Sequence, residues 1–179
     1  MVRKMLKFFA YLLFFLAALI YFTPKVNLYY LLETQLKEQS VVINDEVVHD
    51  NGLSLTINNA SINLKSIESA KIKEINVKFF GVYNSISVTG ISLASVAATM
   101  VPTEVQSISI TYSVLDPLHL VATAVGEFGD AVLSFGAFDG VLHVELHPSK
   151  KMLASYRQTL RNLKKSKEGA YIYDKTFKF

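Results

Sequence analysis

Apolar and polar residues alternate along much of the chain, and this period of two most constrains the possible fold. The clearest stretch is 107–114, where Ile108, Ile110, Tyr112 and Val114 alternate with Ser and Thr. Side chains along a β-strand point alternately to the two faces of a sheet, so alternation indicates one buried and one wetted face. The same pattern occurs in residues 53–57, 62–64, 75–79, 85–89, 118–125, 131–135 and 141–146.

Short turn sequences separate these stretches. They are Asn51-Gly52, Asn58-Asn59, Gly81, Asp116-Pro117, Gly129-Asp130 and Asp139-Gly140. Such residues favour tight turns between neighbouring antiparallel strands. We therefore predict a mainly β fold with roughly eight to ten strands, as a curved sheet, a sandwich or a jelly roll. The stretch Ile91–Val101 is ambiguous: its Ala content allows a short helix, but it is assigned to strand or loop.

A different pattern precedes the strands: no residue from Phe8 to Pro24 is charged. With its flanks this run approaches the ~20 residues that a membrane-spanning helix needs. Arg3, Lys4 and Lys7 precede it, so the N-terminus is expected to remain in the cytoplasm and the rest to be exported.

Two alternatives to a membrane anchor remain open. A cleaved signal peptide needs small residues after the apolar run, but Ala17-Ala18 lies inside it. A buried core helix is rarely apolar on every face. We therefore expect residues 1–24 to form a cytoplasmic N-terminus and a transmembrane anchor.

The remaining chain is divided into three parts. Residues 25–40 are predicted to form a short linker or capping helix, because Leu28, Leu31, Leu32 and Leu36 lie near helical spacing. Its charged residues Glu33, Lys37 and Glu38 are expected to face away from the domain. Residues 41–148 form the predicted antiparallel β domain, and residues 149–179 a basic amphipathic helix followed by a terminal strand.

The C-terminal part differs in charge from the body of the protein. Residues 150–179 carry nine basic and two acidic residues, whereas residues 8–149 have a net charge of −7. Met152, Leu153, Tyr156, Leu160 and Leu163 share one face of the predicted helix. The helix is expected to pack this face on the sheet, to lie on anionic lipid headgroups or to dock on a partner protein. The candidate contact residues are Lys150, Lys151, Arg157, Arg161, Lys164 and Lys165.

The residues that usually carry catalysis form no recognisable constellation. The absence of Cys excludes disulfides, thiolate zinc sites and Cys nucleophiles. His143, Glu145 and His147 share one face of a strand, but positions i and i+4 lie ~13 Å apart, too far to share one ion. We therefore predict no enzymatic activity, no metal and no cofactor; an exported domain also makes a nucleic-acid partner unexpected.

The order of segments resembles known envelope proteins. A Pro-containing exit (Tyr21–Lys25) follows the apolar run, then LYYLLETQL (Leu28–Leu36) and LSLTINNASINL (Leu53–Leu64). This layout is similar to the N component of bacterial type II secretion systems and, more broadly, to AsmA-like envelope proteins. The resemblance implies a single-pass inner-membrane protein with its bulk in the periplasm. Such a protein would take part in secretion or envelope assembly with protein partners.

A second resemblance is to the lipopolysaccharide-transport component that has one anchor helix and a periplasmic β-jelly roll. It matches the size of this chain and implies that the apolar strand faces line a lipid-carrying groove. An apolar strand face looks the same in sequence whether it packs on protein or holds an acyl chain. The shape of the sheet distinguishes the two: a sealed core favours a scaffold, and an open apolar trough favours lipid.

Overall fold

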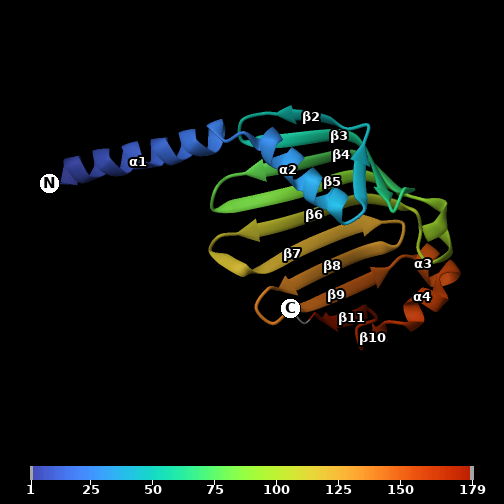
Figure 1. The fold of residues 1–179 in the computed structure, drawn as a ribbon. Helices are drawn as coiled ribbons and strands as arrows, with labels where there is room; N and C mark the ends of the chain where they lie inside the picture. Colours follow the sequence, from blue (N-terminus) through green and yellow to red (C-terminus); the bar gives the residue numbers. More distant parts are fainter. Residues whose placement is uncertain (1, 178–179) are drawn as a thin grey trace.

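A computed structural model describes residues 2–177 (Figure 1). Two helices, α1 (Val2–Phe22) and α2 (Lys25–Glu38), precede the strands. The first strands are β1 (Val41–Asn44), β2 (Val47–Asp50), β3 (Ser54–Leu64), β4 (Ile67–Phe79), β5 (Tyr83–Leu93) and β6 (Glu104–Ser113). Then come β7 (Asp116–Gly126), β8 (Gly129–Gly136), β9 (Val141–Pro148), β10 (Lys164–Lys165) and β11 (Tyr171–Thr176). Helices α3 (Lys150–Ser155) and α4 (Arg157–Arg161) lie between β9 and β10.

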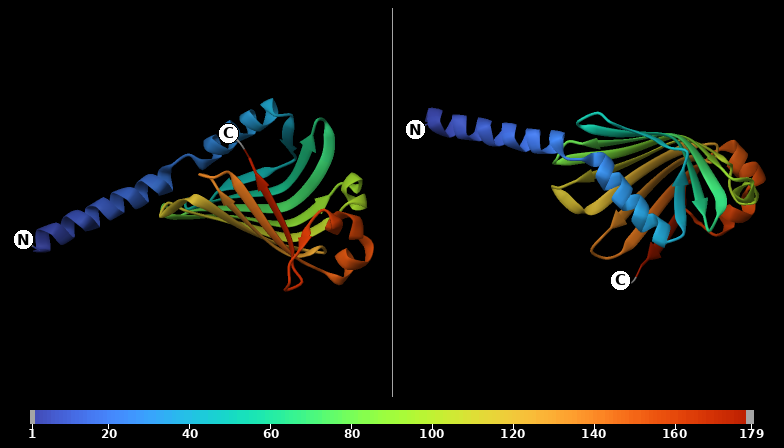
Figure 2. Two further views of the ribbon diagram at one scale, coloured as in Figure 1. Left: turned by 90° about the horizontal axis from the view of Figure 1, so that it is seen from below. Right: turned by 45° about the horizontal axis from the view of Figure 1, so that its top comes forward.

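All these strands belong to one open, antiparallel, 11-stranded sheet. The order is β1-β3-β4-β5-β6-β7-β8-β9-β11-β10, and β2 also pairs with β3. The predicted mainly β class is confirmed, and the curved sheet is the form it takes; no second sheet occurs among residues 2–177. Figure 2 shows the first and last strands rising as two walls of a trough, with α2 on the concave side.

A change in alternation helps to bend the sheet. On β3 the inward residues are Leu55 and Ile57 before Asn59, but Ala60 and Ile62 after it. Asn59 has φ +57°, a left-handed conformation that Asn tolerates better than most residues. The predicted turn at Asn58-Asn59 is therefore wrong: the chain kinks there and continues as one long strand.

The same phase change recurs on the neighbouring strands. Gly90 (φ +63°) separates inward Val88 from inward Ile91 on β5, and the β6–β7 register shifts between Val105 and Ser107. Such irregularities raise local twist and bend a sheet. They keep apolar side chains on the concave side on both sides of the bend.

Helix α2 packs on the concave face over the first strands. Tyr29 is buried against a cluster that includes Leu55 and Ile57. Its hydroxyl donates a hydrogen bond to Glu46 at 3.2 Å. Glu33 is also buried and pairs with Lys37 at 2.7 Å, so the expectation that Glu33 faces away from the domain is wrong.

The segment after β9 differs from its prediction. In place of one amphipathic helix, two short helices meet at Tyr156, whose backbone (φ −120°, ψ 36°) is not helical. The break allows both Met152 and Leu160 to be buried against the sheet. The predicted terminal strand is β11, between β9 and β10.

The Ile91–Val101 segment combines two structures. Ile91–Leu93 complete β5, and Ser95–Thr99 form a short 3-10 helix, η1.

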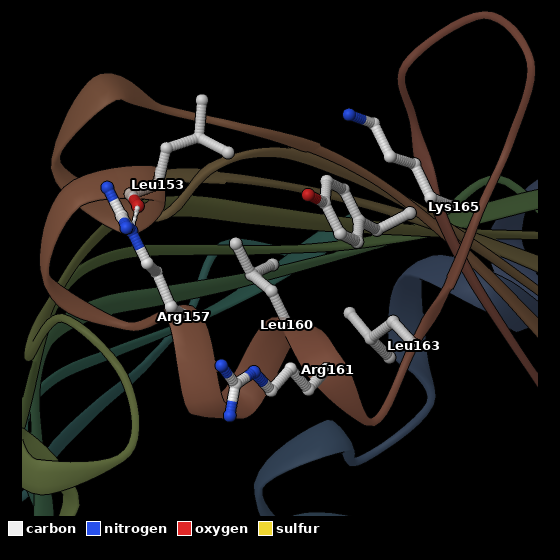
Figure 3. A pocket seen from close by; sticks show the side chains of 7 residues that line it. Leu153, Arg157, Leu160, Arg161, Leu163 and Lys165 are labelled. Atoms are coloured by element: carbon white, nitrogen blue, oxygen red, sulfur yellow. Dashed lines mark hydrogen bonds between the residues drawn. The ribbon is translucent and has the colours of Figure 1, made fainter.

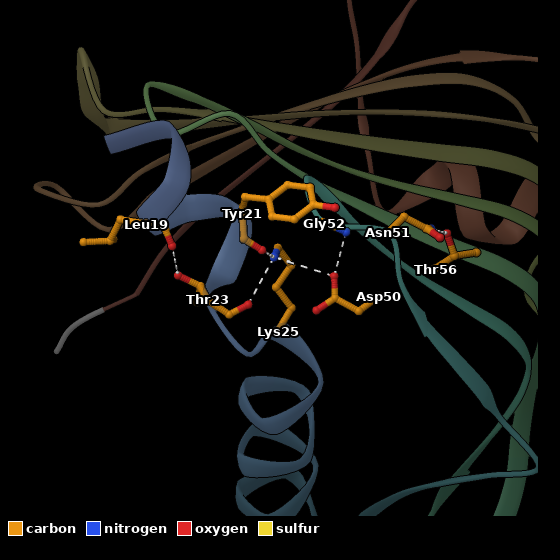
Figure 4. A network of polar contacts seen from close by, with 8 residues as sticks. All are labelled: Leu19, Tyr21, Thr23, Lys25, Asp50, Asn51, Gly52 and Thr56. Carbon is orange, nitrogen blue, oxygen red and sulfur yellow. Dashed lines mark hydrogen bonds and ion pairs between the residues drawn. The ribbon is translucent and has the colours of Figure 1, made fainter. Parts of the chain in front are cut away.

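Helix α1 is uncovered by the rest of the protein, and Arg3–Phe22 is long and apolar enough to cross a membrane. Lys25 contacts the C-terminal end of α1 and links it to the domain (Figure 4). The residue is buried, with 2% exposed. The Lys25 ammonium donates to the carbonyl oxygens of Tyr21 at 3.2 Å and Thr23 at 3.1 Å, and lies 3.6 Å from the Asp50 carboxylate. Gly52 adds a steric contact, because a Cβ there would lie 2.3 Å from the Tyr21 ring.

Candidate functional site

The concave face of the sheet carries continuous rows of apolar side chains that cross the strands. One row is Ile57, Ile75, Val88, Ile108, Ala124, Ala131, Leu146 and Tyr171. The next row is Leu55, Val77, Ile86, Ile110, Ala122, Leu133, Val144 and Tyr173. The intervening strand positions belong to the opposite face; they include Ser87, Ser109 and Thr123, and also Val121, Val125 and Val132, which are 41%, 37% and 43% exposed.

Exposure of this face increases from the first row to the second on β5, β7, β8, β9 and β11, whereas on β3 the second-row Leu55 is only 4% exposed. In the first row Ala124, Ala131 and Leu146 are each 8% exposed, and Ile75, Val88, Ile108 and Tyr171 are half-buried. In the second row Ile110, Leu133 and Val144 are only half-buried, and Ile86 and Tyr173 are exposed. Beyond the second row, Tyr112 and Leu120 are each 37% exposed. The concave apolar face is therefore covered beneath α3 and less covered toward the other end of the strands.

The closed end is covered by the segment after β9. Met152 and Leu160 pack with Ala124, Ala131 and Leu146. The side chain of Ser149 caps α3 by accepting from the Met152 N–H at 3.1 Å, and its hydroxyl donates to the Glu127 carbonyl at 2.5 Å. These contacts fix α3 against the sheet and seal that end.

The open end lies beside the C-terminal end of α1. Ile20 and Thr23 line a small cleft of about 160 Å³ with Leu28, Phe79 and Asn84. On the other wall Phe135 meets Phe177 edge-to-face, with ring centroids 6.4 Å apart. The less covered part of the concave face thus lies toward the edge of the sheet from which α1 leaves (Figures 1 and 2).

The six basic residues proposed as contacts do not form one surface. Arg157, Arg161 and Lys165 surround a cleft of about 520 Å³ together with Leu153, Leu160, Leu163 and Tyr171 (Figure 3). Lys151 instead pairs with Glu127 at 2.5 Å, and this hydrogen bond raises the pKa of its ammonium. Lys150 begins α3, and Lys164 pairs with Ile172 in the sheet.

The basic cleft lies at the closed end of the trough. Since α1 leaves from the opposite edge, these residues are remote from its C-terminal end (Figure 1).

Three of the four histidines lie beside a carboxylate, each beside a different one. His143 lies 2.6 Å from Asp174, His147 lies 3.2 Å from Glu145, and His119 lies 2.7 Å from Asp116. The hydrogen bond with Asp116 raises the pKa of His119. Within residues 2–177 no group of three His, Cys, Asp or Glu residues is placed to hold a metal ion.

The sequence alone did not locate the open end, although its turns there contain unusual residues. Apolar residues occupy turn positions where polar residues are usual: Phe80 and Val82, Val114 and Leu115, and Phe138. Alternation identified the apolar faces of the strands, but it could not show which part of that face a helix covers. Comparisons with protein-family models, curated proteins and solved structures find no match for this chain.

Proposed function

We propose that this protein is a non-enzymatic, membrane-anchored lipid-binding protein that holds hydrocarbon chains in the trough. The observation that carries the proposal is the rise in exposure of the concave face toward the anchor. A soluble domain normally buries the apolar face of its sheet, and apolar side chains left partly uncovered on that face are what a site for an apolar ligand requires. Its position next to α1 favours an occupant that comes from the membrane.

The dimensions suit an acyl chain. The part of β8 beyond the covered Ala131, residues 132–136, is ~17 Å long at 3.3 Å per residue. One leaflet contributes about half of the ~30 Å hydrocarbon core, so its chains fit along the strands. Covering the trough stabilises the complex by roughly 25 cal/mol for each Å² of apolar surface removed from water.

The membrane topology that we propose rests on the basic residues in the first turns of α1. Arg3, Lys4 and Lys7 precede its uncharged part, which favours a cytoplasmic N-terminus. Residues 25–177 then lie on the other side, which is the periplasm for a bacterial inner membrane. We propose this location and a role in moving lipid through the envelope.

The competing proposal is a scaffold in a secretion or envelope-assembly complex, in which a partner protein covers the trough. The two proposals differ in which molecule touches Ile110 and Leu133.

Photocrosslinking of the full chain in its membrane separates them. A benzophenone amino acid is placed at Ile110 or Leu133 on the concave face, with Ser109 and Ser134, their neighbours on the other face, as controls. We expect light-dependent lipid adducts at Ile110 and Leu133 that exceed those at Ser109 and Ser134 at least tenfold. Equal lipid adducts at all four positions, or protein adducts alone at Ile110 and Leu133, would overturn the lipid proposal.

A further inference from the structure

The hairpin tips at the open end of the trough share one edge and are unusually apolar. Antiparallel order places the β4–β5, β6–β7 and β8–β9 turns together at this edge. Phe138 is 90% exposed and Leu115 84% exposed, and Phe80, Val82 and Val114 are exposed as well. None of these five residues belongs to either core cluster or its packed neighbours. Burial in the protein therefore does not explain their apolar character.

The same edge is fixed to the end of α1. Gly81, at the first tip, lies against Ile20, where an added Cβ would be 3.1 Å from the Ile20 side chain. Gly52, at the start of β3, lies against Tyr21. Figure 1 shows the tips level with the C-terminal end of α1 and directed toward the side from which that helix leaves.

The acidic groups at this edge have partners. Asp50 lies beside Lys25, Asp116 pairs with His119, and Asp139 accepts the Val141 N–H at 3.1 Å. These contacts lower the cost of bringing the edge close to a lipid surface, because each carboxylate already has a hydrogen-bond or ionic partner.

From these placements we propose that the three hairpin tips form a membrane-docking edge, with Phe80, Leu115 and Phe138 entering the bilayer that α1 crosses. Apolar and aromatic side chains favour the interfacial region of a bilayer. The inference rests on the proposed function, because the bilayer in question is the one that anchors α1. The docking edge would hold the open end of the trough against the lipid surface. A lipid acyl chain could then enter the trough without crossing water.

The chain contains no Cys, so single labelling sites can be introduced cleanly. The full chain is reconstituted in nanodiscs with an environment-sensitive fluorophore on Leu115→Cys or Phe138→Cys. Matched controls are Val96→Cys and Met100→Cys, since these exposed apolar residues lie in or beside η1 at the opposite edge. Leu13→Cys, within α1, reports on the anchor itself.

We expect nitroxide-labelled lipids to quench the fluorophore at Leu13, Leu115 and Phe138 by more than half, and at Val96 and Met100 by less than a tenth. Equal quenching at the two edges, or no quenching at Leu115 and Phe138, would overturn the docking edge. Absence of quenching at Leu13 would overturn the membrane anchor and the docking edge together.

The quenching and photocrosslinking experiments together distinguish failure of the docking edge from failure of the lipid-binding proposal. Lipid adducts at Ile110 without quenching at Leu115 leave the trough intact and reject the edge. Quenching at Leu115 and Phe138 without lipid adducts at Ile110 supports the edge and rejects the lipid-binding trough.

Discussion

Lys25 and Asp50 join the apolar helix to the sheet, with the Lys25 ammonium 3.6 Å from the Asp50 carboxylate and almost wholly buried. The ammonium also binds the carbonyl oxygens of Tyr21 and Thr23, so one side chain connects α1, α2 and the edge of the sheet. Helix α1 therefore meets the domain through a buried polar contact.

Removing the acid of this joint should destabilise the fold. Asp50→Asn leaves the buried Lys25 charge without its carboxylate, and we expect a loss of about 1–3 kcal/mol in unfolding free energy. Thermal and urea unfolding of the full chain in detergent measure it. The control is Glu68→Gln, which breaks the exposed pair with Lys71 and should cost less than about 0.5 kcal/mol. Equal effects of the two variants would show that the joint contributes no more than a surface pair.

A charge should have different effects at the covered and the less covered parts of the concave face. Ile57 is 4% exposed in the cluster that contains Tyr29, so Ile57→Asp should cost several kcal/mol and unfold the domain. Ile110 lies on the half-open part, where water can reach the carboxylate. Ile110→Asp should therefore fold, with a smaller loss of stability and weaker lipid binding. Circular dichroism of both variants checks this, and unfolding by Ile110→Asp would show that the trough is closed at that position.

Tyr29 should make stability depend on alkaline pH. Burial, and next the neighbouring Glu46 carboxylate, raise the pKa of the Tyr29 phenol well above its ordinary value of about 10. The folded-state pKa exceeds the unfolded one, so this contribution is complete below pH ~10 and is lost as pH rises toward the folded-state pKa.

Tyr29→Phe removes both the hydrogen bond to Glu46 and this titration. We expect the variant to be about 1 kcal/mol less stable at neutral pH, with the difference shrinking above pH ~10. Urea unfolding at several pH values provides the comparison. Parallel stability curves from pH 7 to 12 would contradict the assigned role of Tyr29.

The hairpin tips should contribute little to folding. Leu115→Ser and Phe138→Ser replace side chains that are 84% and 90% exposed, so each should change unfolding free energy by less than about 0.5 kcal/mol. Leu146→Ser is the contrasting variant, because Leu146 is buried beneath α3 and its truncation should cost about 2–5 kcal/mol. A loss at Leu115 or Phe138 comparable with that at Leu146 would mean that the tips are part of the core.

Local periodicity predicted much of this fold because strands and the apolar helix leave direct patterns in sequence. The alternation of Ile108, Ile110 and Tyr112 placed them on one face, as β6 confirms. The kink at Asn59 could not be predicted, because Asn-Asn favours a turn equally well and only the neighbouring strands determine that the chain continues.

The candidate site depended more heavily on tertiary structure. Helical spacing placed Met152 and Leu160 on one face of a continuous helix, whereas packing on the sheet favours a break at Tyr156. Because of that break, Lys151 pairs with Glu127 whereas Arg157 lines the basic cleft. The open end of the trough depends on where α2 and α3 end over the sheet, and no local pattern encodes those positions.

Native mass spectrometry of the full chain released from nanodiscs tests the central claim most directly. Ala122 lies on the half-buried concave row, and its neighbour Thr123 is exposed on the other face, so Ala122→Phe fills the trough whereas Thr123→Phe adds the same side chain outside it. We predict a bound lipid in the wild type and in Thr123→Phe, and at least a fivefold reduction in Ala122→Phe. Equal lipid occupancy in the two variants, with both folded, would contradict a lipid-binding trough.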